Sequence, residues 1–257
     1  MTDLPAGLLQ QSFLAGGEFH YELNSTSTRA LEVGAGDIPL PYLIWAEQQA
    51  AGRGRGHNIW WAGPGALTFT ILLSPQSLGI APAQWPGLSL CVGTAICQFL
   101  QRMQIPDVRL KWPNDVYLSS RKVCGVLIES VACRPDRLAI GIGINVNNSL
   151  LNAPPEIQQR ATSLVDVLST THSLVPFLTG LLQELDSVLT LFGRAPKEFP
   201  PLWRDLCWLT GRQVRMTDVR GSVTGTVLGI ADDGALRVRL PEGESRFVSG
   251  TVEPLSV

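Results

Sequence analysis

Long apolar blocks separated by short polar turns predict a central mixed β-sheet flanked by helices. Three blocks read as buried strands: YLIWAE (42–47), ALTFTILL (66–73) and LAIGIGINVNN (138–148), the last entering a loop at 145–148. Two more strand-like runs, VRLKWPNDVYL and KVCGVLIESVA, are joined by a short SSR turn. Helical patterns cover 87–103, which is apolar nearly all round, 173–192 and 197–209, and Ser25 and Thr26 precede TRALEVG as a predicted helix cap.

The pattern of apolar and polar residues changes at about Gly211. Beyond it stand four short β-like segments, VRMTD, VTGTVLGI, ALRVRL and RFVSG, with Asp233-Gly234 and Pro241-Glu242-Gly243 as turns. This pattern predicts a small β-barrel of roughly SH3 size. We therefore expect an α/β (α+β) domain over residues 1–209 and a second, smaller domain over 210–257.

Composition narrows the class of protein. With 45% hydrophobic and 16% charged residues, the chain reads as globular. Its formal net charge of −2 argues against nucleic acid or an anionic membrane as a partner held by bulk electrostatics. The uncharged stretch 58–101 is interrupted by prolines, and its longest proline-free piece is too short to span a bilayer.

The five cysteines and the N-terminus both bear on the compartment. No cysteine belongs to a CxxC pair, and the odd count lacks the spacing of a disulfide framework, which favours a reducing compartment. MTDLPAGLLQQ has no basic region of the kind that opens a signal peptide. A cytoplasmic enzyme is the expectation.

The first cluster whose residues could bind a ligand is Gly52-Arg53-Gly54-Arg55-Gly56. Alternating glycine lets the backbone approach a ligand closely, and arginine supplies planar charged forks suited to phosphate and carboxylate. The same letters also fit a flexible basic loop or a short nucleic-acid-binding tract. A predicted strand leads into this loop and Trp60-Trp61 follows, a pair able to shield a ligand from water, so the context favours a ligand-binding loop.

Three further clusters are Lys111-Trp112-Pro113-Asn114-Asp115, the run from Lys122 to Leu127, and the run from Gly141 to Asn147. Lys122 begins an apolar run, so it points either to solvent or into a cleft, and the sequence does not choose between them. Asn145 either ends a strand or offers its amide to the edge of an adenine.

Taken together, these motifs resemble one family. Q-x-x-GRGR before a tryptophan, KWPND, K-x-x-G-[IV]-L and G-I-G-[IL]-N, in this order and spacing, are similar to the bacterial biotin–protein ligases, and Ser25-Thr26 fits the D-S-T-N element of that family. The resemblance spans about residues 20 to 255. It implies a class II synthetase-like biotin/lipoate ligase catalytic domain followed by an SH3-like domain.

The resemblance also implies an activity: ATP-dependent formation of biotinyl-5′-AMP with release of pyrophosphate, then transfer of biotin to a lysine of a biotin carboxyl carrier protein. ATP with Mg²⁺ is the implied cofactor, without a dedicated protein metal site. A homodimer stays open, and neither DNA nor membrane is expected as a partner. The implied biotin-binding residues are Ser25, Thr26, Ser27, Gln49, Arg53, Gly54, Arg55, Trp60 and Lys122. The implied ATP and adenylate residues are Arg53, Arg55, Trp60, Lys111, Lys122 and Asn145, and Lys122, Arg55, Lys111 and Asp115 are the implied catalytic group.

The chain departs from the family pattern at three places. The family usually continues GRGR-x-G-R, whereas this chain has Gly56-His57-Asn58, which affects how the loop closes over the adenylate. Ser27 stands where the D-S-T-N element has asparagine, which puts its role in doubt. Only 23 residues precede that element, too few for an N-terminal helix-turn-helix domain, so DNA binding is not expected.

Three other functions compete with this interpretation. Lipoate ligases and octanoyltransferases share the expected fold, but lipoate has no ureido group to match a Ser-Thr-Gln set. The octanoyltransferases use a cysteine in a Pro-Cys-Gly loop, and the corresponding region here reads Asn152-Ala153-Pro154-Pro155; Cys124 is expected to be a small buried residue instead. A non-catalytic protein with an RG-rich nucleic-acid loop is the alternative from a different class.

Overall fold

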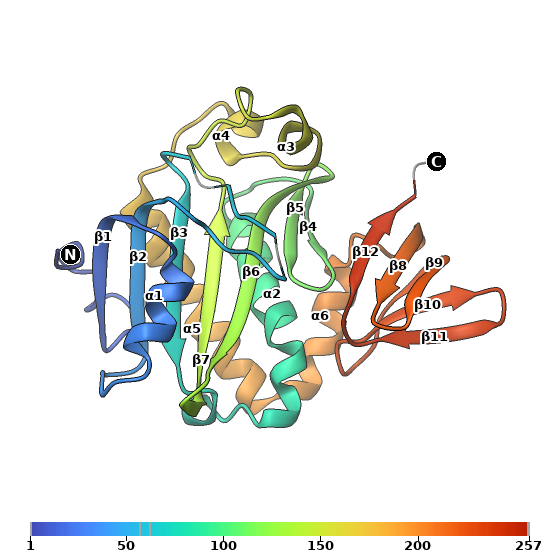
Figure 1. The fold of residues 1–257 in the computed structure, drawn as a ribbon, viewed down its shortest axis with the longest axis horizontal. Helices are drawn as coiled ribbons and strands as arrows, with labels where there is room; N and C mark the ends of the chain where they lie inside the picture. Colours follow the sequence, from blue (N-terminus) through green and yellow to red (C-terminus); the bar gives the residue numbers. More distant parts are fainter. Residues whose placement is uncertain (1, 57, 62, 256–257) are drawn as a thin grey trace.

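Two β-sheets organise the chain in the computed structural model, which describes residues 2–56, 58–61 and 63–255 (Figure 1). The larger sheet has the order β1-β2-β3-β7-β6-β5-β4, with β1 parallel to β2 and every other neighbouring pair antiparallel. Its strands are β1 (Gly16–Leu23), β2 (Tyr42–Gln49), β3 (Leu67–Leu73), β4 (Val108–Lys111), β5 (Asp115–Leu118), β6 (Arg121–Val131) and β7 (Arg134–Ile144). This mixed sheet confirms the expected fold class.

Helices cover both faces of the larger sheet. The longest, α2 and α5, lie together on one face, and α1 lies on the other (Figure 1). The α-helices are α1 (Thr26–Val33), α2 (Leu88–Arg102), α3 (Pro155–Arg160), α4 (Leu164–Leu168), α5 (Leu174–Arg194) and α6 (Phe199–Leu206), and the 3₁₀ helices are η1 (Pro75–Leu78), η2 (Pro82–Gly87) and η3 (Pro196–Glu198). By length and composition α5 would be apolar enough to cross a membrane, but its apolar stripe packs on α2, as in the core helix of a globular domain.

Side-chain alternation along the strands divides the core between these two faces. Leu43 and Trp45 of β2 point to the α2 and α5 side, and Ile44 points to the α1 side. Strand β3 is buried along its whole length because helices cover it on both faces. The continuous apolar run 66–73 therefore predicts a central strand without revealing which residue faces which side.

The structure differs from the sequence expectations at four places. VRLKWPNDVYL is two strands and not one, because the chain reverses between Lys111 and Asp115, which pair directly across β4 and β5. Pro113 has no N–H to give to a ladder and Asn114 suits a turn, so a reversal at this point follows from their chemistry. Strand β1, the short helices α3 and α4, and a last strand over Thr251–Pro254 were not expected.

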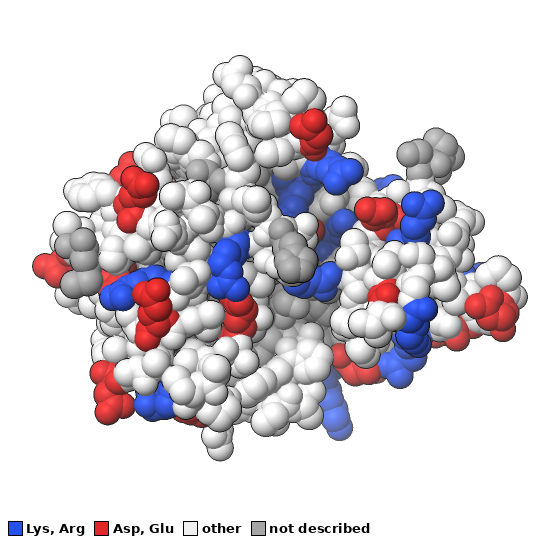
Figure 2. Space-filling model, in the orientation of Figure 1, with Lys and Arg blue, Asp and Glu red and all other residues white. Residues whose placement is uncertain are grey.

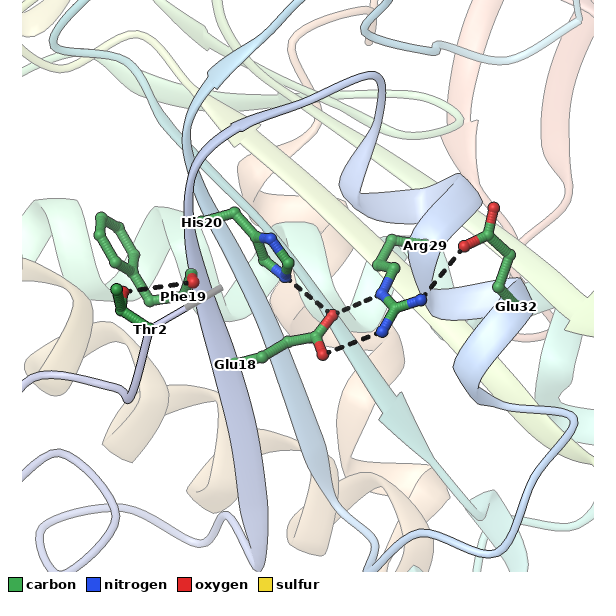
Figure 3. Close-up of polar contacts among 6 residues, drawn as sticks. All are labelled: Thr2, Glu18, Phe19, His20, Arg29 and Glu32. Carbon is green, nitrogen blue, oxygen red and sulfur yellow. Dashed lines mark hydrogen bonds and ion pairs between the residues drawn. The ribbon is translucent and has the colours of Figure 1, made fainter.

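A cluster of charged side chains fixes α1 against the edge strand β1 (Figure 3). The carboxylate of Glu18, only 4% exposed, accepts hydrogen bonds from Arg29 of α1 at 2.8 and 3.3 Å, and His20 Nε2 lies 3.0 Å from it. Burial opposes ionisation of Glu18, but the hydrogen bonds from Arg29 and His20 outweigh it and lower its pKa. The pair holds α1 in one orientation, and with it the residues at its N-terminus.

The smaller sheet is antiparallel, with the order β11-β10-β9-β8-β12, and confirms the expected C-terminal β domain. Its strands are β8 (Gln213–Asp218), β9 (Gly221–Ile230), β10 (Leu236–Leu240), β11 (Gly243–Phe247) and β12 (Thr251–Pro254). The indole N–H of buried Trp112 donates at 3.0 Å to the carbonyl of Gly234, which lies in the turn between β9 and β10. The two sheets are therefore joined through a buried hydrogen bond as well as through the chain.

Candidate active site

One cavity lies on the α1 side of the larger sheet, where the smaller sheet meets it. It brings ten of the twelve predicted site residues to one surface: Thr26, Ser27, Gln49, Arg53, Gly54, Arg55, Trp60, Lys111, Asp115 and Lys122. Thr251 and Val252 of β12 complete its wall. Figure 2 shows Lys and Arg side chains gathered along the hollow between the larger sheet and the smaller one.

A chain of hydroxyl and amide groups lines the end of the cavity near β2 and β3. Gln49 Oε1 accepts from the backbone N–H of Thr26 at 2.7 Å and from its hydroxyl at 3.2 Å. Thr70 Oγ1 lies 2.9 Å from Thr26 Oγ1 and 3.4 Å from Ser27 Oγ. Because the Gln49 oxygen is occupied by Thr26, its NH₂ group is left to donate to a ligand.

Glycines form the floor of the cavity. Gly125 of β6 and Gly143 of β7 are direct partners across the sheet, and the indole of Trp60 lies on both. A Cβ added at Gly143 would sit 2.5 Å from the Trp60 ring, and one at Gly141 would sit 2.5 Å from Ser27 Oγ. Only glycine allows these side chains to lie this close to the strands, so the alternation in GIGIN serves the cavity.

The two arginines of the glycine-rich loop are held by different partners. Arg53 forms an ion pair with Glu129 of β6 and donates to the Thr28 hydroxyl at 3.4 Å. Arg55 donates through Nη2 to the backbone carbonyl of Gly250, just before β12. The loop is thus tied to the larger sheet at Arg53 and to the smaller sheet at Arg55.

Lysine side chains line the opposite end of the cavity. Lys122 Nζ lies 2.6 Å from Asp115 Oδ1 and 5.7 Å from the centre of the Trp60 ring, so Lys122 points into the cavity and not to solvent. Lys111 is beside it, and burial lowers the pKa of its ammonium group although Asp115 acts in the other direction. Two cations and one carboxylate leave this end positively charged, as a phosphate site requires.

Four residues singled out in the sequence are not among the described residues that line the cavity. Ser25 caps α1, its Oγ accepting from the Thr28 backbone N–H at 3.5 Å. Asn145 is buried below the cavity, where its amide donates to the Thr162 carbonyl at 3.0 Å and accepts from Asn148 at 2.9 Å, so its contact with adenine stays a prediction. Trp61, 39% exposed, does not line the cavity beside Trp60. His57 of the departing loop lies outside the described residues.

Sequence reasoning missed Thr70, Glu129 and the β12 residues Thr251 and Val252. Glu129 follows Gly125 by four positions on one strand, so period-two alternation was a usable signal that it shares the cavity face. Nothing local marks Thr70 within the apolar run of β3, nor Thr251 and Val252, which come to the cavity from the far end of the chain.

Cys124 does not supply a nucleophile. Its side chain is fully buried in the core cluster, and burial raises the pKa of the thiol well above its ordinary value. This setting confirms the expectation of a small buried cysteine and disfavours octanoyl transfer through a cysteine at this position.

Comparisons with known proteins agree with this arrangement. A sequence profile of the biotin/lipoate A/B protein ligase family matches residues 20–147, and one of the biotin protein ligase C terminal domain matches residues 209–253. The chain is 32% identical to the biotin–[acetyl-CoA-carboxylase] ligase of Paracoccus denitrificans over 86% of this chain and 92% of that protein. It is 30% identical to the bifunctional ligase/repressor BirA of Bacillus subtilis over 91% of this chain and 73% of that protein.

A solved structure is also similar. The biotin protein ligase from Aquifex aeolicus in complex with biotin and ATP superposes with a TM-score of 0.82 at 29% identity, covering 95% of this chain and all of that one. Fold, motif order and sequence identity agree from the first strand of the larger sheet to the last strand of the smaller one. The chain therefore belongs to the biotin–protein ligases of the biotin/lipoate A/B protein ligase family.

Proposed function

We propose that this chain activates biotin with ATP and transfers it to a lysine of a carrier protein. The observation that carries the proposal is one cavity with an amide and hydroxyl set at one end, a glycine floor in the middle and lysines at the other end. Biotin has the same sequence of chemical groups: a ureido head, an apolar ring and tail, and a carboxylate that must meet the α-phosphate of ATP.

The hydroxyl and amide set suits the ureido head. Thr26, Ser27 and Gln49 offer both donors and acceptors, and a buried ureido group left without partners would cost about 1–3 kcal/mol for each unpaired atom. Thr70 holds Thr26 in place by their 2.9 Å hydrogen bond. Lipoate has a dithiolane ring in place of the ureido head, so it would leave these buried groups unpaired.

The cations suit the first half-reaction. The biotin carboxylate attacks the α-phosphorus, the bond to the β-phosphate oxygen breaks, and pyrophosphate leaves with the electron pair, which yields biotinyl-5′-AMP. Two anions must meet for this to occur, and Arg55, Lys111 and Lys122 offset their repulsion. Asp115, 2.6 Å from Lys122, orients that lysine.

The second half-reaction needs a dry cavity more than it needs another charged group. The carrier lysine amine attacks the acyl carbon, the bond to the phosphate oxygen breaks, and AMP leaves. Trp60 covers the glycine floor and limits the access of water to the mixed anhydride until the amine arrives.

Mg²⁺ fits this cavity as part of the MgATP substrate. Within the described ranges, no group of three His, Cys, Asp or Glu residues lies close enough to hold a metal ion. Mg²⁺ needs only one or two carboxylates when phosphate oxygens and water complete its coordination, and Asp115 is the cavity carboxylate that would contribute. The ion would screen the phosphate charge during attack.

The partner and compartment follow from the same proposal. A biotin carboxyl carrier protein of acetyl-CoA carboxylase or a related carboxylase is the expected acceptor, as in the name of the Paracoccus relative. The free cysteines, of which Cys91, Cys97 and Cys124 are buried, fit the cytoplasm. A homodimer stays a prediction, and sedimentation with and without biotin and ATP tests it.

The direct test is one incubation of the protein with MgATP, biotin and a biotin carrier domain, followed by mass spectrometry. We expect a mass gain of one biotinyl group on the carrier, with pyrophosphate released. Replacing biotin by lipoate should give neither product. A gain with lipoate and none with biotin would overturn the proposed substrate.

A further inference from the structure

The two cavity lysines are held in different ways. Lys122 is neutralised by Asp115 at 2.6 Å. Lys111 takes part in no ion pair among residues 2–56, 58–61 and 63–255, and its ammonium group instead lies 5.2 Å from the centre of the Tyr117 ring. Burial lowers the pKa of this ammonium group, and the charge of Asp115 acts in the other direction without a direct contact.

The ring under Lys111 is the second member of a ladder that runs out of the cavity. Tyr117 packs against Trp208 in a tilted arrangement, with ring centres 4.7 Å apart and an angle of 38° between the planes. The guanidinium carbon of Arg212 lies 4.2 Å from the centre of the Trp208 ring on the way to β8. The two rings thus lie between two cations, Lys111 and Arg212.

Backbone hydrogen bonds fix both ends of the ladder. Trp208 N–H donates to the carbonyl of Leu110, the neighbour of Lys111 on β4, at 2.8 Å. Arg212 Nε donates to the Trp208 carbonyl at 2.8 Å, and the Arg212 carbonyl accepts from Val227 N–H of β9 at 2.9 Å. The ladder therefore connects Lys111 to the first residues of the smaller sheet without a flexible link.

We propose that Tyr117 and Trp208 are positioning residues that hold Lys111 at the cavity for the polyphosphate of ATP. This inference rests on the proposed function and assigns the ladder a part in it. Neither aromatic residue lines the cavity, so each acts through Lys111.

An aromatic ring and a carboxylate hold a phosphate-binding cation in different ways. The ring attracts the ammonium group by its quadrupole and leaves its positive charge uncancelled. An arriving phosphate then meets an ammonium group on Lys111 that is in direct contact with no carboxylate, whereas at Lys122 it must displace the 2.6 Å contact with Asp115. Because the ladder ends at Arg212, the placement of the smaller sheet sets the placement of Lys111.

The test measures ATP and biotin binding separately by titration calorimetry, so it does not depend on turnover. Tyr117→Leu should raise the Kd for ATP by about five- to thirty-fold, the range expected for a lost cation–π contact, and leave the Kd for biotin within about twofold. Tyr117→Phe keeps the ring and should keep ATP affinity within about twofold. Trp208→Leu should weaken ATP binding and Trp208→Phe should restore most of it.

A double-mutant cycle separates positioning from general loss of structure. In a Lys111→Ala background, Tyr117→Leu should change the Kd for ATP by less than about twofold, because the residue it acts on is gone. Arg220→Ala is the matched control: it removes a cation–π contact with Phe247 at 5.3 Å in the same smaller sheet, away from the cavity, and should leave ATP binding unchanged.

Two results would overturn the inference: unchanged ATP affinity in Tyr117→Leu, or an equal loss with and without Lys111. If a melting curve shows that Tyr117→Leu does not fold, the two Trp208 variants decide the question, since they leave Tyr117 in place. A wild-type protein that binds ATP but biotinylates no carrier would refute the proposed function while leaving this test intact.

Discussion

Adding one methyl group to the floor of the cavity should separate ligand binding from folding. In Gly143→Ala, the new Cβ would lie 2.5, 2.7 and 2.8 Å from three atoms of the Trp60 indole. Ordinary contact begins at about 3.5 Å, so the ring must retreat by about 1 Å. Trp60 belongs to a loop and β7 keeps its extended backbone, so the displacement falls on the loop and not on the sheet.

The expected loss follows from that distance. Overpacking costs about 1–3 kcal/mol, and a reacting group misplaced by about 1 Å can cost about a hundredfold in rate. We therefore expect biotinyl-AMP formation to fall about ten- to a hundredfold. The melting temperature should fall by about 2–12 °C, at about 2–4 °C per kcal/mol for a chain of this size.

The assay is single-turnover pyrophosphate release alongside a melting curve. Gly36→Ala is the matched control, because the nearest atom to its added Cβ is 3.6 Å away, an ordinary contact. A Gly143→Ala enzyme with wild-type rates would refute the role of the glycine floor. A large loss of stability with an unchanged rate per folded molecule would refute it equally.

Four other changes have expected outcomes. Lys122→Ala should nearly abolish adenylate formation with little effect on melting, and near wild-type pyrophosphate release would exclude Lys122 from the reaction. Arg55→Ala removes the contact with the Gly250 carbonyl and should loosen the loop, so biotinyl-AMP escapes and bystander proteins become biotinylated; equal labelling by wild type would contradict this. Deleting the chain from Gly211, near our proposed domain boundary at 209/210, should abolish adenylation while the larger domain still melts cooperatively. Full rates for both half-reactions in the truncated protein would show that the smaller sheet is dispensable. Burial lowers the pKa of Lys111 below its ordinary value near 10.5, so this lysine loses its positive charge as the pH rises through that lowered pKa. KM for ATP should rise over the same pH range, and the rise should be absent in Lys111→Ala.

The site residues that could be predicted share one property: each stands in a short local motif at the edge of an apolar run. Gln49 ends a strand, Lys122 is the second residue of one, and Lys111 and Asp115 flank a proline turn, so their chemistry was visible without knowledge of distant contacts. The order of these motifs was enough to identify the family. The fold class followed from the same alternation of apolar blocks.

The parts of the fold and site that the sequence did not predict depend on contacts between segments far apart in the chain. Thr70 is hidden because a strand buried on both faces has no polar side to mark its orientation. The partner of Arg55 is a backbone carbonyl 195 positions away, which no side-chain pattern specifies. Strand β1 was missed because GGEFHYEL opens on two glycines and exposes several positions at the sheet edge.

The indole at the joint between the two sheets also gives the protein an optical signal of its own. Trp112 is one of seven tryptophans, is 2% exposed, and donates to the Gly234 carbonyl. Its emission should therefore lie at the blue end of the range for tryptophan and shift to the red if the sheets part and water reaches the ring. The difference spectrum between wild type and Trp112→Phe isolates that contribution, so separation of the two sheets during a catalytic cycle can be followed in real time without an attached dye.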